Sequence, residues 1–117
     1  NIAPHENDVW SHRQLLSVVS HTPVETEGLA RILAEGRLTD IARAAHGAEE
    51  KLYTWWSYRA LDWRASNRGR RLDHIWADFR AAPRIDLSSY RIHMDERDGF
   101  KPSDHVPVTV QVAAAHG

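Results

Sequence analysis

The sequence predicts a mixed α/β protein in which two helices come first and four strands follow. Residues 24–34 place leucine and isoleucine at helical spacing and begin with glutamates, which favour the positive end of a helix dipole. Residues 106–112 carry valine at every second position, which is the period of a strand with one buried face. Because helices precede strands, we expect a layered α/β or α+β arrangement.

Capping residues and glycine indicate where the two expected helices begin and end. Thr22 is a suitable N-cap, Pro23 fits the first helical position, and Glu25 completes a capping box. A second, shorter helix is expected over residues 39–45 and is ended by Gly47.

The strand signals begin after residue 52. Residues 53–56 favour β structure, 67–69 form a turn, and 72–76 and 89–94 are expected strands in addition to 106–112. Four strands with two helices give a sheet with one uncovered face, which fits poorly with a complete domain.

Length and composition narrow the classes of protein. The chain has 117 residues, the size of one small domain, and its lack of cysteine excludes disulfides and Cys-ligated zinc. A net charge of −1 argues against a polybasic tail. The chain opens with Asn1, its only methionine is Met94, and no apolar run suits a signal or a membrane span. We therefore expect no membrane association, and either a processed start or the later part of a longer protein.

The net charge hides a basic block. Residues 51–84 hold 8 basic and 3 acidic side chains, seven of the basic ones are arginines, and Trp55, Trp56 and Trp63 lie among them. Arginine forks grip phosphates and aromatic faces accept bases or sugars, so the mixture suits a phosphodiester partner. The alternative is a solvated face of an arginine-rich chain.

The densest polar segment is residues 101–107, a loop with two prolines that delivers Asp104 and His105 at the mouth of a strand. A histidine there can act as general acid or base, or contact a phosphate. Asp73 stands in an otherwise apolar strand and is the expected partner of His105, because a buried carboxylate needs one. Asp104 is expected to face the other way, and so is His74, which is interpreted as structural.

Other polar and aromatic residues have simpler interpretations. Trp10, Trp56 and Trp76 are expected in the core. Asp40 and Arg43, three residues apart on the second helix, are expected to form an intrahelical pair or a contact at the edge of the core.

Several ordered motifs resemble the exonuclease III family of Mg²⁺-dependent apurinic/apyrimidinic endonucleases, within the endonuclease/exonuclease/phosphatase superfamily. They are YTWWSY at 53–58, NRGRRLDHI at 67–75 and KPSDHVP at 101–107. Upstream, LTDIAR at 38–43 is similar to the family's L-x-D-x-x-R helix. NIAP at 1–4 is similar to the end of its G-D-x-N-[IV]-x-P motif.

The resemblance implies a four-layer α/β sandwich of two packed sheets flanked by helices. Members are roughly twice as long as this chain. Residues 1–117 would then be the C-terminal half of that domain, with the N-terminal half absent. The resemblance also implies that this polypeptide alone is inactive and poorly soluble, because an uncovered apolar sheet invites aggregation.

The resemblance also implies roles for single residues. Asn1, Asp73 and His105 would be catalytic: Asn1 binds the scissile phosphate, Asp73 holds the histidine and His105 contacts the phosphate. Asn1, Asp104 and His105 would form the metal environment, for Mg²⁺ with Mn²⁺ as an alternative.

Four residues are implied to contact DNA: Trp55 against an abasic sugar, Arg70 and Leu72 in the same region, and His105. The implied function is a DNA repair nuclease that hydrolyses phosphodiesters at abasic sites and 3′ ends of duplex DNA. Such an enzyme would be monomeric when full length, would lie in the cytoplasm near the nucleoid and would not bind membranes.

Two alternatives remain open. The chain could be another phosphodiesterase or phosphatase of the superfamily, acting on a phosphoinositide, a sphingolipid or non-specific DNA. It could also be a non-catalytic fragment that binds DNA through its arginine and tryptophan block.

Overall fold

A computed structural model describes residues 1–114 of the chain. Its α-helices are α1 (His12–Leu15), α2 (Pro23–Glu35), α3 (Ile41–His46) and α4 (Trp63–Ser66). Its 3₁₀ helices are η1 (Glu6–Asp8), η2 (Ala82–Arg84) and η3 (Met94–Asp98). Its strands are β1 (Thr39–Asp40), β2 (Trp76–Ala77), β3 (Ile85–Ile92) and β4 (Val108–Val112).

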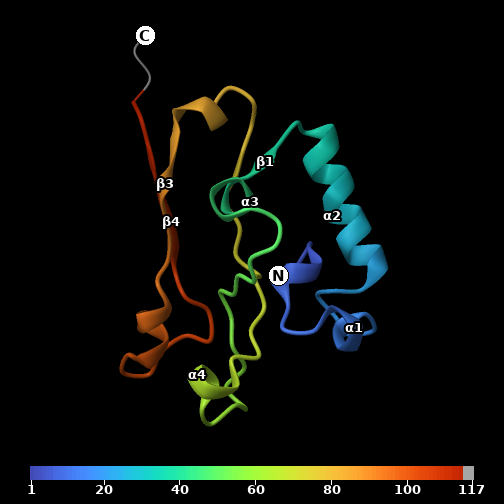
Figure 1. Cartoon of the computed structure of the whole chain (residues 1–117), viewed down its shortest axis with the longest axis vertical. Helices are drawn as coiled ribbons and strands as arrows, with labels where there is room; N and C mark the ends of the chain where they lie inside the picture. The colour runs from blue at the N-terminus through green and yellow to red at the C-terminus, as the bar shows by residue number, and fades with distance from the viewer. Residues whose placement is uncertain (115–117) are drawn as a thin grey trace.

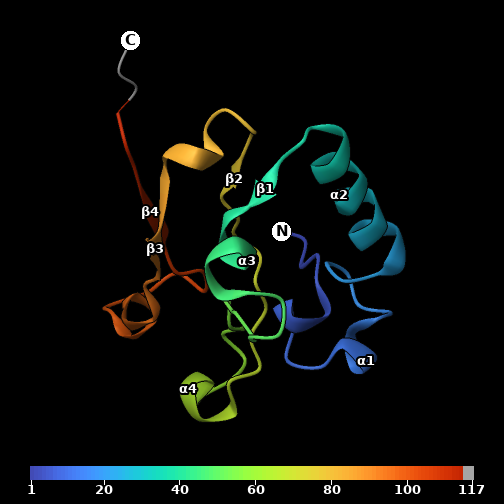
Figure 2. The same ribbon diagram turned by 45° about the horizontal axis from the view of Figure 1, so that its top comes forward.

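The elements form three layers. In Figure 1, α2 lies on one side and the β3–β4 hairpin on the other, with the extended segments of the middle of the chain between them. Figure 2 shows the same order after rotation, with α3 over the central segments and α4 at one end. The mixed α/β fold class is therefore confirmed. Among the described residues, no helix has the length and apolar character needed to cross a membrane.

Helix α2 confirms the prediction from its capping signals. The Glu25 carboxylate accepts hydrogen bonds from the Thr22 hydroxyl at 2.7 Å and from the Thr22 backbone N–H at 3.3 Å. These bonds satisfy donors that the first turn leaves free, and they lower the pKa of Glu25. Pro23 stands at the first helical position and Gly36 caps the end, where the helix stops.

Helix α3 begins two residues later than expected. Thr39 and Asp40 pair with β2 as strand β1, and the helix starts at Ile41 with Asp40 as its N-cap. Gly47 ends it with φ of +78°, a conformation that glycine adopts without strain.

The β3–β4 hairpin confirms the two last strands with shifted ends. β3 runs over residues 85–92 rather than 89–94, and it pairs antiparallel with β4 from Ile85↔Val112 to Ile92↔Val108. β4 starts at residue 108 rather than 106, because the Val106 backbone N–H donates to the carbonyl of Thr54 instead.

Extended segments, rather than a regular sheet, fill the centre of the molecule. Isolated bridges join Val9 to Arg70, Arg70 to Trp55, and Trp55 to His105, so four segments lie side by side. Gly69 lets the neighbouring segment approach, since a Cβ there would lie 2.6 Å from the Tyr53 side chain.

The predicted strands at 53–56 and 72–76 are wrong as regular strands. The Thr54 hydroxyl accepts the backbone N–H of Leu72 at 3.0 Å and that of Asp73 at 3.1 Å. A side-chain hydroxyl therefore takes the place of a backbone carbonyl, and the backbone hydrogen bonding between these two segments stops at this point.

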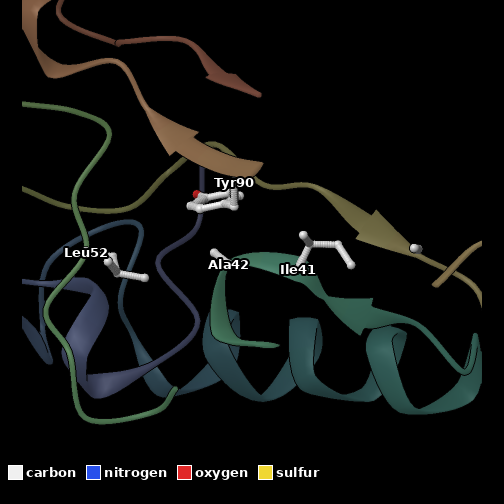
Figure 3. Close-up of a cluster of buried hydrophobic side chains, with 5 residues drawn as sticks. Ile41, Ala42, Leu52 and Tyr90 are labelled. Atoms are coloured by element: carbon white, nitrogen blue, oxygen red, sulfur yellow. The ribbon is translucent and has the colours of Figure 1, made fainter. Parts of the chain in front are cut away.

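Three buried clusters hold the layers together. The first joins α3 to β3 and the central segments; Figure 3 shows Ile41 and Ala42 of α3 below Tyr90 of β3, with Leu52 beside them. Burial raises the pKa of the Tyr90 phenol to about 12. The other two clusters consist of Ala3, Val9, Leu15 and Leu72, and of Trp56, Trp63 and Val106.

The tryptophans follow the sequence prediction only in part. Trp56 is 1% exposed and lies in the core as expected. Trp10 and Trp76 are half-buried: Trp10 packs against the edge of the cluster that contains Val9, and Trp76 stacks on His74.

A buried ion-pair network ties the N-terminal segment to the centre. The Arg71 side chain is fully buried and donates bidentately to Asp8, at 2.7 and 3.0 Å, and to Asp40, at 2.8 and 2.6 Å. Burial alone would lower the pKa of Arg71, but the two carboxylates outweigh it and raise that pKa. Arg43 also donates to Asp8, so Asp40 and Arg43 do not form the expected intrahelical pair. Both side chains join the buried network instead, Arg43 through Asp8 and Asp40 through Arg71.

Replacing Arg71 with methionine should strongly destabilise the fold. The change removes the ion-pair partner of Asp40 and leaves the buried Asp8 with Arg43 alone, and breaking such a buried pair costs about 3–5 kcal/mol. Urea unfolding measures the loss. Arg80→Met, at an exposed arginine, is the matched control and should change the unfolding free energy by less than about 0.5 kcal/mol. Equal stability of the two variants would contradict the role of the network.

Candidate active site

Asp73 and His105 form a hydrogen-bonded pair between two central segments. The distance from His105 Nδ1 to Asp73 Oδ2 is 2.8 Å, and the two side chains are 32% and 33% exposed. The pairing that the sequence predicted is therefore confirmed. Because an ionised carboxylate only accepts, Nδ1 carries the proton and Nε2 is left for a substrate.

Thr54 fixes the orientation of Asp73. Its hydroxyl donates to Asp73 Oδ2 at 2.7 Å while it accepts the two backbone N–H groups of Leu72 and Asp73. Thr54 is fully buried, so its hydroxyl uses all of its hydrogen-bonding capacity inside the protein. The same contact that stops the ladder thus aims the carboxylate at His105.

Asp104 serves a different neighbour from His105. Its Oδ2 accepts the indole Nε1–H of Trp55 at 3.0 Å, and its carbonyl accepts the backbone N–H of Trp56 at 3.1 Å. Asp104 therefore does not orient His105, as expected from the sequence, and it fixes the indole of Trp55 beside the pair.

Asn1 is exposed, and the residues after it are firmly held. His74 Nε2 donates to the carbonyl of Ile2 at 2.6 Å, and His21 Nδ1 donates to that of Ala3 at 2.8 Å. The Ala3 N–H donates to Ser20. Since His74 follows Asp73 directly, the Asn1 segment lies beside the Asp73 segment. No hydrogen bond among the described residues joins Asn1 to Asp73 or His105.

His74 is structural, as predicted. Burial and the nearby positive charge of Arg71 lower the pKa of its imidazole. The ring stacks on Trp76 with centroids 5.5 Å apart, and its Nδ1 is buried without a hydrogen-bond partner.

The three other residues implied to contact DNA differ in exposure. Trp55 and Arg70 are half-buried and form a stack, with the guanidinium carbon 5.1 Å from the indole centroid. Leu72 is only 8% exposed and packs in the cluster with Val9. Its place is in the core, so little of the side chain is left for DNA.

The implied metal environment is incomplete in the described residues. They contain no group of three or more His, Cys, Asp or Glu side chains that could hold a metal ion. Mg²⁺ needs one or two carboxylates in near-octahedral geometry, and Asp104 is the single carboxylate among the implied ligands. The residues present therefore do not form a metal site by themselves.

Known protein structures share the fold of this chain. No protein-family model matches the sequence, and no curated protein matches it. Solved structures do. The 3′ phosphatase NExo from Neisseria, bound to a product DNA hairpin, superposes with a TM-score of 0.86 and 31% identity, covering 97% of this chain and 42% of its own.

Two further structures match equally well. The 3′–5′ exonuclease NExo from Neisseria meningitidis gives a TM-score of 0.85 at 31% identity, covering 97% of this chain and 43% of its own. An AP endonuclease from Archaeoglobus fulgidus gives 0.85 at 29%, with 97% and 42% coverage. The chain thus spans less than half the length of the structures it matches.

The chain has the fold of one part of the matched exonuclease and AP endonuclease structures. The resemblance to the exonuclease III family is confirmed, and the match to part of each structure is consistent with a C-terminal half. The roles of the single residues stay predictions.

Sequence reasoning missed three features of the site. Thr54 lies inside the 53–58 motif. The only sign of its role in the sequence is a threonine directly before two tryptophans. The basic block that suits a phosphodiester partner includes Arg71, which is buried and cannot reach one. The contact of His74 with Ile2 joins residues 72 positions apart and left no local signal.

Removing the Thr54 hydroxyl should loosen the site. Thr54→Val leaves the N–H groups of Leu72 and Asp73 buried without an acceptor, at a cost of about 1–3 kcal/mol. Thr54→Ser keeps the hydroxyl and should retain the slow hydrogen exchange of both amides. Hydrogen exchange followed by NMR measures this, and equal protection in the Val and Ser variants would contradict the assignment.

Stability should fall on mild acidification through His74. Its pKa is lowered in the folded state, so the unfolded state takes up a proton that the folded state resists. This contribution is complete above the unfolded pKa of about 6.5 and is lost as pH falls below it. In His74→Gln, which keeps a donor for Ile2, unfolding free energy should decline less between about pH 7 and pH 5. An identical decline would exclude His74 as the source.

Proposed function

We propose that this chain is the C-terminal part of a DNA repair nuclease that hydrolyses phosphodiester bonds. The observation that carries the proposal is the Asp73–His105 pair, one third exposed and beside Trp55, in a fold shared with an exonuclease and an AP endonuclease. A histidine held by a carboxylate is suited to moving protons at a reacting centre.

The geometry defines what each group of the pair does. Asp73 accepts the Nδ1–H of His105 and fixes the ring, which leaves Nε2 directed away from the carboxylate. Nε2 takes a proton from the attacking water or, once protonated, donates to an oxygen of the phosphate. The charge of Asp73 then balances that of the imidazolium.

The substrates we propose are abasic sites and 3′ ends of duplex DNA. The matched structures, named as an AP endonuclease, a 3′–5′ exonuclease and a 3′ phosphatase, support this choice. The abasic sugar would meet Trp55, whose indole is fixed by Asp104.

Magnesium dependence is part of the proposal, with Asn1 and Asp104 as the contribution of this chain to a site that needs further ligands. A divalent cation would offset charge on the phosphoryl oxygens. We expect the purified 117-residue chain to show no Mg²⁺-dependent nicking of an abasic duplex, because that site is incomplete. Robust nicking by the chain alone would contradict this expectation.

The catalytic pair is tested in a complete nuclease. This chain can replace the matching segment of the Neisseria exonuclease, after a check that the chimera folds. His105→Ala and Asp73→Ala should each lower kcat by about 10²–10⁴-fold, while DNA affinity stays close to that of the parent.

His93→Ala is the matched control, since His93 is an exposed histidine that contacts Thr109 rather than the pair. It should leave kcat unchanged. An unaltered rate in His105→Ala would remove the basis of the proposed function and would favour DNA binding without catalysis.

A further inference from the structure

We propose that Arg97 is a positioning residue for His105, because its buried guanidinium fixes the loop that leads to this histidine. The proposal rests on the proposed function, since it concerns the group that would act on the phosphate. Neither the sequence motifs nor the comparisons give Arg97 a role. It lies in η3 (Met94–Asp98), and residues 99–104 lead from η3 directly to His105.

The Arg97 side chain is a buried cation that no acid neutralises. The residue is 6% exposed, and no ion pair within residues 1–114 involves it. Its Nε is buried and has no hydrogen-bond partner in the described part of the chain. Removing a cation from water is costly unless other groups stabilise it. The burial of Arg97 therefore has to be offset by neutral groups.

Two aromatic rings and one carbonyl take the place of an acid. The Arg97 guanidinium carbon lies 5.0 Å from the Tyr58 ring centroid and 5.7 Å from that of Trp63, both within the range of cation–π attraction. Its Nη2 donates to the Trp56 carbonyl at 3.4 Å. A planar guanidinium suits these partners, since it can lie on a ring and donate from its edge. All three partners lie within residues 56–63, so Arg97 joins η3 to that segment.

Further contacts join the same two stretches of chain around the buried guanidinium. Trp63 Nε1 donates to Asp98 Oδ1 at 3.1 Å, and Arg64 Nη2 donates to Asp98 Oδ2 at 2.5 Å. At the other end of the loop, the Tyr58 hydroxyl donates to the Pro102 carbonyl at 2.7 Å. These bonds are exposed or only partly buried, whereas the guanidinium is shielded from water, where electrostatic attraction is stronger. The loop before the histidine is therefore fixed at its start and at its end.

The loop passes this constraint on to His105. The Trp56 N–H donates to the Asp104 carbonyl at 3.1 Å, so the residue whose carbonyl accepts from Arg97 also holds the residue before His105. The ring of His105 meets Asp73 at 2.8 Å. A displacement of about 1 Å would break that hydrogen bond, and such a misplacement can lower a reaction rate by about 10²-fold.

Arg97 acts through the loop rather than on the substrate. A cavity of about 550 Å³ beside His105 is lined by Glu96 and Gly99, among others, but not by Arg97. With so little of its side chain exposed, Arg97 presents no face to a phosphate. A change at this position should therefore affect the rate of reaction more than the affinity for DNA.

Kinetics of the chimera with the Neisseria exonuclease test the proposal. Arg97→Met removes the charge and the planar group. It should lower kcat by about 10–10²-fold and change KM by less than about twofold, because the surface that meets DNA is kept. Arg84→Met is the matched control: Arg84 also donates to a backbone carbonyl, that of Ala113, but it is exposed and lies outside the loop. It should leave kcat unchanged.

Two variants at the exposed Tyr58 decide the question even where Arg97→Met does not fold. Tyr58→Phe and Tyr58→Leu both lose the hydrogen bond to Pro102, but only the leucine variant also loses the ring face beside Arg97. The kcat of Tyr58→Leu should therefore fall about two- to fivefold below that of Tyr58→Phe. Equal kcat values in these two variants would contradict the role of Arg97.

The proton on His105 Nδ1 provides a readout that does not depend on cleavage. In the parent chimera this proton is bonded to Asp73 and should exchange slowly with water. Exchange measured by ¹H NMR should be faster in Arg97→Met and in Tyr58→Leu, and unchanged in Arg84→Met. Parent-like exchange or parent-like kcat in a folded Arg97→Met chimera would overturn the proposal.

Failure of this proposal is separable from failure of the proposed function. If His105→Ala cleaves as fast as the parent chimera, the proposed function fails, and proton exchange still decides the role of Arg97. If His105→Ala is inactive while Arg97→Met cleaves as fast as Arg84→Met, the role of Arg97 alone is contradicted.

Discussion

The buried guanidinium of Arg71 is the interaction on which the rest of the structure depends. It joins Asp8 of the N-terminal segment and Asp40 at the start of α3 to the central segment that carries Asp73. The backbone N–H of Arg71 also donates to the Asp8 carbonyl at 2.7 Å. With three segments fixed at one point, the segment that follows Arg71 has little freedom, and this restricts the position of Asp73.

Two neighbouring arginines show how this arrangement separates structure from binding. Successive side chains of an extended segment point to opposite sides. Arg71 therefore enters the interior and is neutralised, whereas Arg70 points to the other side, lies over the Trp55 ring and donates only to neutral acceptors. The Thr54 hydroxyl accepts the backbone N–H of Asp73, which ends the backbone pairing there, and it donates to the Asp73 carboxylate, which orients that group toward His105.

Local sequence signals predicted the features that depend on few neighbours. Helix α2 follows from Thr22, Pro23 and Glu25, which act within one turn, and the hairpin strands follow from alternation. The Asp73–His105 pair was predictable because an acid in an apolar strand needs a partner. The irregular centre was not, since the hydroxyl of one threonine replaces backbone acceptors there. Nor was the Arg71 network, whose partners lie 63 and 31 positions away.

The central claim is that the buried network and Thr54 together hold His105 in one tautomer. Imidazole ¹⁵N NMR of the chain measures this directly. The account predicts that neutral His105 carries its proton on Nδ1, with Nε2 unprotonated, and that a folded Arg71→Met variant loses this preference. Nδ1 and Nε2 signals that average in the parent chain, or an unchanged tautomer in the variant, would contradict it.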